Sequence, residues 1–298
     1  MGTMTITRRQ FIAAGLGTCA AGCGLGFYTW RIEPHWVRFV RMPLPVANLP
    51  ADLDGALLVQ LSDLHVGPQV DSRFLIRTLK RVGDMNPRFV VFTGDFVSYR
   101  AGTGLRELSR VLRAWPAAED GSVAVLGNHD YGHRWRQPRV ADEVVRRASD
   151  AGIKVLRNER ATFGGLDITG FDDLWSPRFD PAAALKDADP KRPSIVLCHN
   201  PDALDEPVWG SYQGWVLSGH THGGQCKPPF LPPPLLPIRN TLYTAGEIDL
   251  KDGRHLYVNR GLGHLMRVRF NVRPEVTVFT LRRAMKLREE LTRGQEAS

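Results

Sequence analysis

Two histidines separated by a single residue stand in a glycine-bearing segment of the chain. Residues 218–225 read Ser-Gly-His-Thr-His-Gly-Gly-Gln, so the histidines are His220 and His222. On an extended backbone, side chains two residues apart point the same way, and flanking glycines allow the backbone to approach an ion closely. Taken alone, this segment is equally compatible with two ordinary histidines in a polar turn.

Four other segments carry similar residues, each where an apolar run gives way to a loop. In chain order they supply Asp63, His65, Asp95, Asn128, His129 and His199. Open α/β sheets gather ligand-binding groups at the carboxyl ends of their strands, so we expect these side chains to meet. Carboxylate, amide and imidazole ligands together suit Mn, Fe, Zn or Co better than Ca or Mg. Without His129, the candidate ligands are too many for one ion and suffice for two if one carboxylate bridges them.

The elements that would position these residues follow from hydrophobic periodicity. Continuous apolar runs at 56–61, 89–92 and 122–126 predict strands buried on both faces. Apolar residues at helical spacing predict helices around Leu75, Leu108 and Val144. Further strands are expected at 153–156, 161–163, 166–170, 194–198, 214–218, 255–259 and 275–281. The first half therefore predicts a parallel βαβαβα unit and the second a more antiparallel sheet, with helices on both outer faces.

The N-terminus has the composition of a targeting segment. Residues 7–12 read Thr-Arg-Arg-Gln-Phe-Ile and precede a short run rich in Ala and Gly, which resembles a twin-arginine export signal. The run is short and glycine-rich for a membrane span, and a disordered leader is the alternative. Cys23 lies in a weak match to a lipoprotein cleavage box; without cleavage the segment would be an anchor. We expect a signal or anchor at 1–27, a lead-in with an edge strand at 28–52, one domain at 53–283 and a charged tail at 284–298.

Composition narrows the classes of partner. The chain has 298 residues, of which 43% are hydrophobic, and a formal net charge of +8. Such an excess suits phosphate esters, anionic lipid surfaces or nucleic acid without choosing among them. Four cysteines in a chain of this length do not make a disulfide scaffold.

The ordered motifs resemble those of the calcineurin-like metallophosphoesterases, whose pattern is D-x-H, G-D, G-N-H-[DE], H and G-H-x-H. All five blocks occur in order between about residues 55 and 281. The resemblance implies an αββα sandwich of two mixed sheets flanked by helices. It also implies that one ion is held by Asp63, His65 and His222, and a second by Asn128, His199 and His220. Asp95 would bridge both ions, and His129 would contact the scissile ester.

Within that family, the chain looks most similar to an exported, membrane-associated branch of phosphodiesterases. The residues that carry this likeness are 219–225, the apolar proline-rich loop at 227–237 and the Asn-Arg-Gly-Leu-Gly run at 259–263. The Asp-Arg-Gly run of the protein Ser/Thr phosphatases is missing after Asp95. Ser98 replaces an acidic residue that is common in the branch.

The implied chemistry is hydrolysis of a phosphodiester or related anionic phosphate by a hydroxide that two divalent ions activate. His129 would protonate the leaving oxygen, with Asp130 orienting its ring. Arg260 and His264 are candidate substrate contacts. The loop at 227–237 is expected to form an exposed apolar ridge that touches an acyl chain or a membrane, or else to be an ordinary packed loop.

Several functions compete with an exported phosphodiesterase acting in the periplasm or cell envelope. One is a nucleotide-lipid pyrophosphatase, similar to the UDP-diacylglucosamine hydrolases, which would need the cytoplasmic leaflet. The basic charge is also compatible with a nuclease, although nucleic acid is the disfavoured partner. A metal-binding module without activity is disfavoured because every ligand position holds a competent residue. The expected partners are a phosphate-ester or lipid substrate, a membrane surface and the twin-arginine export machinery.

Overall fold

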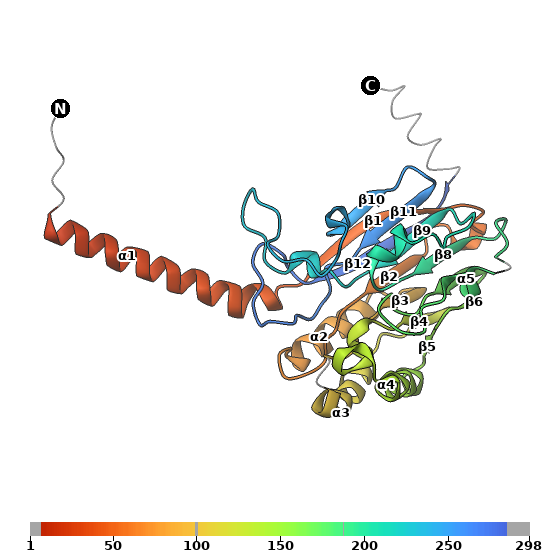
Figure 1. Cartoon of the computed structure of the whole chain (residues 1–298), viewed down its shortest axis with the longest axis horizontal. Helices are drawn as coiled ribbons and strands as arrows, with labels where there is room; N and C mark the ends of the chain where they lie inside the picture. The colour runs from red at the N-terminus through yellow and green to blue at the C-terminus, as the bar shows by residue number, and fades with distance from the viewer. Residues whose placement is uncertain (1–6, 99–100, 187, 285–298) are drawn as a thin grey trace, which may run out of the picture.

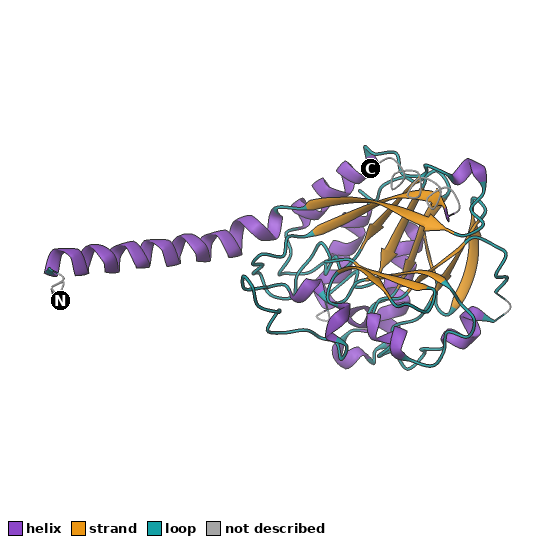
Figure 2. Cartoon of the chain, turned by 90° about the horizontal axis from the view of Figure 1, so that it is seen from above, coloured by secondary structure: helices purple, strands orange, loops and turns teal. Residues whose placement is uncertain are grey.

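The body of the protein consists of two six-stranded sheets packed face to face, with helices outside them (Figure 2). The computed structural model describes residues 7–98, 101–186 and 188–284. The predicted sandwich of two mixed sheets with flanking helices is confirmed. The first sheet has the order β1-β12-β2-β3-β4-β5, and the second has the order β10-β11-β9-β8-β7-β6.

The strands coincide closely with the apolar runs of the sequence. In the first sheet they are β1 (Arg38–Val46), β2 (Leu57–Leu61), β3 (Phe89–Thr93), β4 (Gly121–Val125), β5 (Ile153–Val155) and β12 (Glu275–Arg283). In the second they are β6 (Glu159–Phe163), β7 (Leu166–Gly170), β8 (Ser194–Leu197), β9 (Gly214–Ser218), β10 (Gly246–Asp249) and β11 (Arg254–Val258). Only β10 had no counterpart among the predicted elements.

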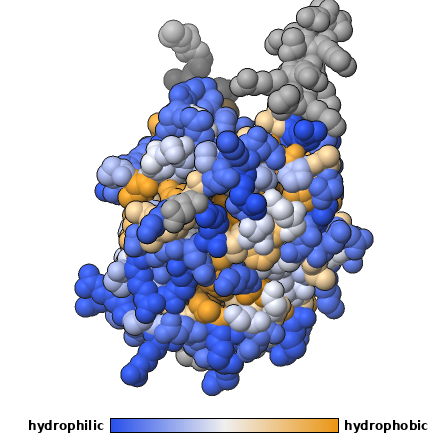
Figure 3. Space-filling model, turned by 90° about the vertical axis from the view of Figure 1, so that its right-hand side faces the viewer, coloured by the Kyte–Doolittle hydropathy of each residue, from blue (hydrophilic) through white to orange (hydrophobic). Residues whose placement is uncertain are grey.

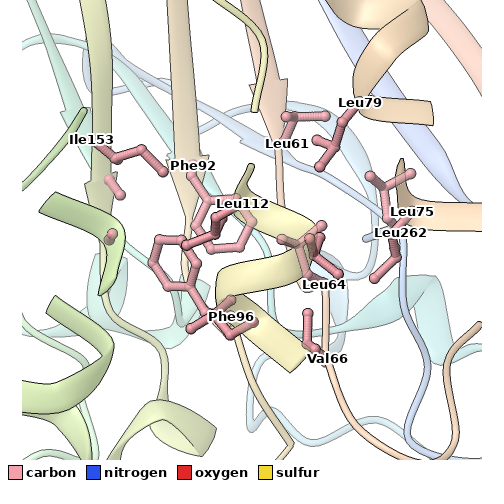
Figure 4. Packing of buried hydrophobic residues seen from close by; sticks show 14 of the residues in the cluster. Leu61, Leu64, Val66, Leu75, Leu79, Phe92, Phe96, Leu112, Ile153 and Leu262 are labelled. Carbon is pink, nitrogen blue, oxygen red and sulfur yellow. The ribbon is translucent and has the colours of Figure 1, made fainter. Parts of the chain in front are cut away.

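The first sheet is buried on both faces, which explains its unbroken apolar runs. Along β2, Val59 and Leu61 join the core beneath the helices, whereas Leu58 joins the core between the sheets. That outer core is visible in Figure 4, where Leu61 lies close to Leu79 of a covering helix. Side chains that alternate between two dry environments are mostly apolar, and the exception in β2, Gln60, is hydrogen-bonded.

Three helices cover the outer face of the first sheet, as their periodicity predicted. They are α2 (Ser72–Gly83), α3 (Ala101–Leu112) and α4 (Pro138–Asp150), which line the lower side of the body in Figure 1. The Asp71 side chain caps α2 by accepting a hydrogen bond from the Arg73 backbone N–H at 2.8 Å. The second sheet has a smaller outer core that includes Trp209 and Tyr243, with the short helix α5 (Pro181–Leu185) beside it.

The second sheet differs from the expected, more antiparallel arrangement. Its interior strands β7, β8, β9 and β11 run parallel, and only its edge strands β6 and β10 pair antiparallel. The connections between the parallel strands are long enough to cross over, and parallel pairing requires such crossovers. The carboxyl ends of β8 and β9 therefore meet at one edge, as those of β2, β3 and β4 do in the first sheet.

The N-terminal region enters the body at that same edge. It forms α1 (Arg8–Phe27), followed by a π-helical turn (Tyr28–Ile32) and a short 3-10 turn (Glu33–His35). Strand β1 then starts opposite the start of β12, with Arg38 beside Glu275. Because β12 is antiparallel to β2 and pairs Thr277 with Gln60, β1 begins where β2 ends. The helix α1 thus leaves the body from the edge that carries the ends of β2, β3 and β4 (Figure 1).

The helix α1 makes no buried contact. Thr7 caps it in a reciprocal arrangement with Gln10, and none of its residues is buried. Residues Arg8–His35 form a helical stretch long and apolar enough to cross a membrane by length and composition, contrary to the expectation that the run is too short. A signal sequence can have the same length and apolar composition. The expected charged tail lies outside the described residues apart from Ala284.

Candidate metal centre

All the predicted ligand side chains converge where the strands end. Asp63 and His65 follow β2, Asp95 follows β3, and Asn128 follows β4. His199 follows β8, and His220 and His222 follow β9, so the site lies across the mouth between the two sheets. The buried Gln60 joins the sheets beneath it, because its Nε2 donates to the Ser218 carbonyl at 2.9 Å and to Thr93 Oγ1 at 3.1 Å.

The backbone at these positions is unusual. Asp63, His65, Asp95, His220 and His222 all adopt left-handed φ angles between 45° and 70°. Non-glycine residues rarely take this conformation, and such residues cluster at functional sites. The expectation of an extended backbone through His220 and His222 is therefore wrong: the tight turn sends the two rings to different halves of the site.

The first half of the site contains Asp63, His65 and His222. The Nε2 atoms of the two histidines lie 2.9 Å apart, and His222 Nε2 lies 3.3 Å from Asp63 Oδ1. Asp63 Oδ2 accepts hydrogen bonds from Ser62 Oγ at 2.5 Å and from the His220 backbone N–H at 3.2 Å. Asp63 Oδ1 is buried and has no hydrogen-bond partner among the described residues. A buried carboxylate oxygen facing two imidazole nitrogens fits a cation.

The second half contains His199, His220 and Asn128, and its hydrogen bonds fix which nitrogens face the site. His199 Nδ1 lies 2.6 Å from the Thr93 carbonyl, and His220 Nε2 lies 3.0 Å from the Pro237 carbonyl. A carbonyl can only accept, so these two nitrogens carry the protons. The opposite nitrogens, His199 Nε2 and His220 Nδ1, lie 3.2 Å apart and face the site, where each could bind an ion once it carries no proton. Asn128 Oδ1 lies 3.2 Å from His199 Nε2.

Asp95 lies between the two halves. Its Oδ2 atom is 3.5 Å from His65 Nε2 and 3.2 Å from His199 Nε2. Its Oδ1 atom accepts a hydrogen bond from the His129 backbone N–H at 2.9 Å. One oxygen is therefore held by the protein, and the other faces both ligand sets. A Cβ at Gly127 would collide with this carboxylate, which explains the glycine there.

The electrostatics of the cluster suit cation binding. Burial alone would raise the pKa of Asp63, but His222 and the other histidines hold it well below its usual range. Burial and the neighbouring His199 together lower the pKa of His220 to about 3. Burial also opposes protonation of His199, yet Asp95 raises the pKa of that ring well above its usual value. An ion entering this half must displace a proton from His199.

His129 and Asp130 were expected to work as an acid and its orienting partner. His129 is largely buried and lines the cavity, and burial lowers its pKa to about 4. Both carboxylate oxygens of Asp130 are held by backbone groups. Its Oδ2 accepts from the backbone N–H groups of Asp95 and Gly127, both at 3.0 Å, and its Oδ1 accepts from that of Val97 at 3.1 Å. Asp130 is thus a positioning residue for the loops that carry Asp95 and Asn128. Burial and Asp95 raise its pKa, whereas the backbone donors oppose this.

The two expected substrate contacts lie away from the cavity. The Arg260 guanidinium pairs with the buried Glu275 carboxylate and lines a different pocket, behind the site. His264 is buried, and its Nε2 lies 2.9 Å from the Gln69 carbonyl. Neither side chain lines the cavity over the ligands, so the sequence motif around 259–263 has a structural purpose. Its backbone cradles Asp63: the Gly263 N–H donates to the Asp63 carbonyl at 2.6 Å.

Arg269 holds that cradle in place and was not predicted from the sequence. Arg269 is fully buried, and its Nη2 donates to the carbonyls of Gly263 at 2.5 Å and Gly261 at 3.1 Å. Nothing in the sequence distinguishes it from neighbouring arginines, because the pattern Arg-Val-Arg resembles an exposed strand. Its burial depends on chain segments far away in the sequence.

A cavity of about 980 Å³ opens over the ligands. Asp95, Asn128, His129, His220 and His222 form its floor. Its rim contains Trp135, Trp175, Leu265, Pro237 and the basic Arg134 and Arg136. The two tryptophan rings pack at a tilt with centroids 4.7 Å apart, and Trp175 also contacts His220 edge-on at 4.8 Å. These rim residues were not predicted, because a lone tryptophan in a loop resembles a core residue in the sequence.

Comparison with known proteins shows which family the chain resembles. The family model for calcineurin-like phosphoesterases matches residues 57–224. The uncharacterized metallophosphoesterase YkuE of Bacillus subtilis is 32% identical, covering 93% of this chain and 98% of that protein. The phosphodiesterase YaeI of Escherichia coli is 31% identical, covering 93% and 99%. The UDP-2,3-diacylglucosamine pyrophosphatase LpxG of Chlamydia trachomatis is 30% identical, covering 89% and 95%.

The chain therefore belongs to the calcineurin-like phosphoesterase family, and it is a metal-dependent phosphoric ester hydrolase. The prediction of family and reaction class is confirmed. Among the residues that the structure describes, three buried groups of Asp and His side chains are able to hold metal ions: Asp63 with His65 and His222; Asp95 with His199 and His220; and His65 with Asp95 and His129.

Proposed function

We propose that this member of the calcineurin-like phosphoesterases is a dinuclear phosphodiesterase that works at the outer surface of the cytoplasmic membrane. The observation that carries the dinuclear assignment is the position of Asp95 Oδ2, 3.5 Å from His65 Nε2 and 3.2 Å from His199 Nε2. Asp63, His65 and His222 would hold one divalent ion, and Asn128, His199 and His220 the other, with Asp95 bridging. Mn, Fe, Zn and Co all suit this mixed donor set.

Different side chains of the site would have different roles in hydrolysis. When bound, the two ions supply Lewis acidity, which makes hydroxide available at neutral pH and offsets phosphoryl charge. His129 lies on the cavity floor, where it would donate a proton to the leaving oxygen. Asp130 and Arg269 hold the ligand loops rigid, and the rim around Trp135 and Trp175 excludes water from one side of the substrate.

Export by the twin-arginine machinery and retention at the membrane are the finer part of the proposal. The paired Arg8 and Arg9 begin α1, whose exposed, mildly apolar surface has no partner in the body. We assign residues 1–27 to the signal or anchor, 28–52 to a lead-in, 53–283 to the catalytic domain and 284–298 to the tail. The twin-arginine route carries folded proteins, which allows the ions to be bound before export.

A nucleotide-lipid pyrophosphatase is the second candidate. The aromatic pair at the rim and the apolar Leu265 and Pro237 would suit a substrate with both a base and acyl chains. The related LpxG bears the name of such an activity. This activity needs the cytoplasmic leaflet, whereas the exported enzyme would meet only the outer one.

Two experiments test these assignments. The full chain, loaded separately with Mn, Fe, Zn or Co, should hydrolyse phosphodiesters such as bis(p-nitrophenyl) phosphate faster than phosphomonoesters or pyrophosphates. A preference for pyrophosphates would select the second candidate instead. In parallel, protease added to spheroplasts should digest the catalytic domain from outside, and substituting lysines for Arg8 and Arg9 should leave it inside and protected. Protection of the unaltered chain would contradict export.

A further inference from the structure

A second, strongly basic pocket lies at the junction between the N-terminal helix and the body. It has a volume of about 350 Å³ and is separate from the cavity over the metal ligands. Its walls come from the π-helical turn after α1, the start of α2, and α3. The arginines that line it are Arg31, Arg73, Arg110 and Arg267.

The charge of this arginine pocket is only partly balanced within the protein. Two acidic residues also line it, but both are engaged: Glu107 pairs with Arg110 at 3.1 Å, and Asp71 caps α2. Arg267 donates to the carbonyls of Pro68 and Gln69, which leaves its charge uncompensated. Within the described parts of the chain, Arg31, Arg73 and Arg267 form no ion pair. Clustered guanidinium groups are suited to binding a phosphate.

The pocket's position points to the source of that phosphate. Arg31 follows the last residue of α1 by four positions, so the pocket lies where a membrane-inserted α1 would emerge. Exposed apolar side chains adjoin two of its arginines in the sequence: Trp30 precedes Arg31, and Leu265 and Met266 precede Arg267. The end of the molecule that faces away from α1 has a predominantly hydrophilic surface (Figure 3). Basic groups beside apolar ones at the end of an apolar helix match the level of lipid headgroups.

We propose that the arginine pocket binds the phosphate of an anionic phospholipid in the bilayer that α1 enters. This inference rests on the membrane attachment in the proposed function, but not on the reaction that the metal centre catalyses. The ligand that we propose is a phospholipid headgroup such as that of phosphatidylglycerol. Inorganic phosphate has the same chemistry without the acyl chains.

Lipid binding there would also orient the metal cavity. His264 and Arg267 both contact the carbonyl of Gln69, at 2.9 and 3.2 Å, which ties the loop after β11 to the loop after β2. On the loop after β11, Leu265 lines the metal cavity, whereas Arg267 lines the arginine pocket. A headgroup held by Arg267 would keep the rim at Leu265 against the bilayer. Substrates carrying acyl chains would then reach the ligands without leaving the membrane.

The test is native mass spectrometry of the full chain in detergent with added phosphatidylglycerol or phosphatidylcholine. We expect one phosphatidylglycerol to bind in preference to phosphatidylcholine. The double variant Arg31→Gln/Arg73→Gln should weaken that binding about thirtyfold, since each arginine near a lipid surface contributes about 1 kcal/mol. The matched control Arg77→Gln/Arg106→Gln removes the same charge from exposed positions on α2 and α3 outside the pocket and should bind as the unaltered chain does.

Three outcomes would overturn the proposal. Equal losses in the two double variants would mean that general charge attracts the lipid. Equal binding of phosphatidylcholine would mean that no headgroup site exists. Displacement of phosphatidylglycerol by inorganic phosphate at the same concentration would assign the pocket to a soluble anion. Hydrolysis of bis(p-nitrophenyl) phosphate by the unaltered chain is measured separately, so that failure of the proposed reaction is distinguishable from failure of the lipid site. Unfolding temperatures of the variants exclude misfolding as the cause of lost binding.

Discussion

The Oδ2 atom of Asp130 lies 3.0 Å from the backbone nitrogen of Asp95, the residue that faces both ligand sets. The same oxygen lies 3.0 Å from the backbone nitrogen of Gly127, and Oδ1 lies 3.1 Å from that of Val97. The carboxylate thereby joins the loop after β3 to the loop after β4. The position of one candidate ligand relative to the next depends on a residue that needs no contact with an ion.

Replacing Asp130 by asparagine should destabilise the protein. The amide keeps one acceptor oxygen and presents an N–H₂ group to backbone N–H donors, so at least one buried donor loses its partner. An unsatisfied buried donor costs roughly 1–3 kcal/mol. We expect a loss of that size in the free energy of unfolding, measured by denaturant titration, together with weaker metal binding. The control is Asp142→Asn, which removes an exposed partner of Arg157 and should cost less than about 1 kcal/mol. Equal effects of the two substitutions would refute the positioning role.

Asp95→Asn should change the number of bound ions. The Oδ2 atom of Asp95 faces His65 and His199 together. A neutral amide cannot compensate the charge of two cations at once. After dialysis, elemental analysis should give about two ions per unaltered chain and one or none per variant, whereas the exposed Asp249→Asn should retain both. Two tightly held ions in the Asp95 variant would remove the bridging assignment.

The sequence was sufficient to predict the convergence of the ligands, for a physical reason. Runs such as 56–61 are apolar except at Gln60 because both faces of the strand are buried, as Val59 and Leu58 show. The ends of the strands could therefore be located from the sequence, and a polar residue directly after such a run had to lie at the edge of the sheet. The parallel direction of β7, β8 and β9 was not readable, because apolar runs carry no direction and their connections contain little regular helix.

Other features depend on contacts between distant segments. The left-handed turn at His220 and His222 is fixed by its surroundings: the His220 backbone N–H donates to Asp63 Oδ2 at 3.2 Å. Arg260 was expected at the substrate because it is basic and follows a strand. Its side chain pairs instead with Glu275 of the neighbouring β12, a pairing that no local pattern specifies. Arg269 is the converse case, since a fully buried arginine has no signature in the sequence.

The proline-rich loop at 227–237 should matter for lipid substrates alone. Phe230, Leu231 and Leu235 are exposed, which agrees with the expected apolar ridge. The Pro237 carbonyl at the end of the loop accepts from His220 Nε2 at 3.0 Å, so the ridge adjoins the metal centre. The double change Phe230→Asp/Leu235→Asp should raise KM for an acylated nitrophenyl phosphodiester in vesicles by roughly a hundredfold or more, because burial of each large apolar side chain contributes about 1.5–3 kcal/mol.

The control for that prediction is a soluble ester. KM for bis(p-nitrophenyl) phosphate should stay the same in the double variant, and Ala182→Asp on α5 should affect neither substrate. If KM for the acylated substrate were as low in the double variant as in the unaltered chain, the loop would be an ordinary surface turn. A rise in KM for both substrates would indicate damage to His220 through Pro237.

The last prediction separates proton donation from metal binding at His129. Its backbone N–H donates to Asp95 Oδ1 at 2.9 Å, and its ring meets that of His65 edge-on with centroids 4.9 Å apart. One ligand atom each of His65, Asp95 and His129 lie within 4.8 Å of one another, so a ligand role is the competing assignment. Burial lowers the pKa of His129 to about 4, and an anionic phosphoryl group beside the ring would shift that pKa upward.

A general acid matters in proportion to how badly the leaving group needs a proton. Proton donation typically contributes about 10²–10⁴-fold in rate. His129→Ala should therefore keep its full metal content while slowing esters with alkoxide leaving groups by a factor in that range. Nitrophenolate is a good leaving group without a proton, so nitrophenyl esters should be slowed distinctly less. A series of diesters that differ in leaving-group pKa gives a slope of log kcat, which should be steeper in the variant. Parallel slopes at full metal content would make His129 structural, and loss of an ion would make it a ligand; either result would require another source for the proton.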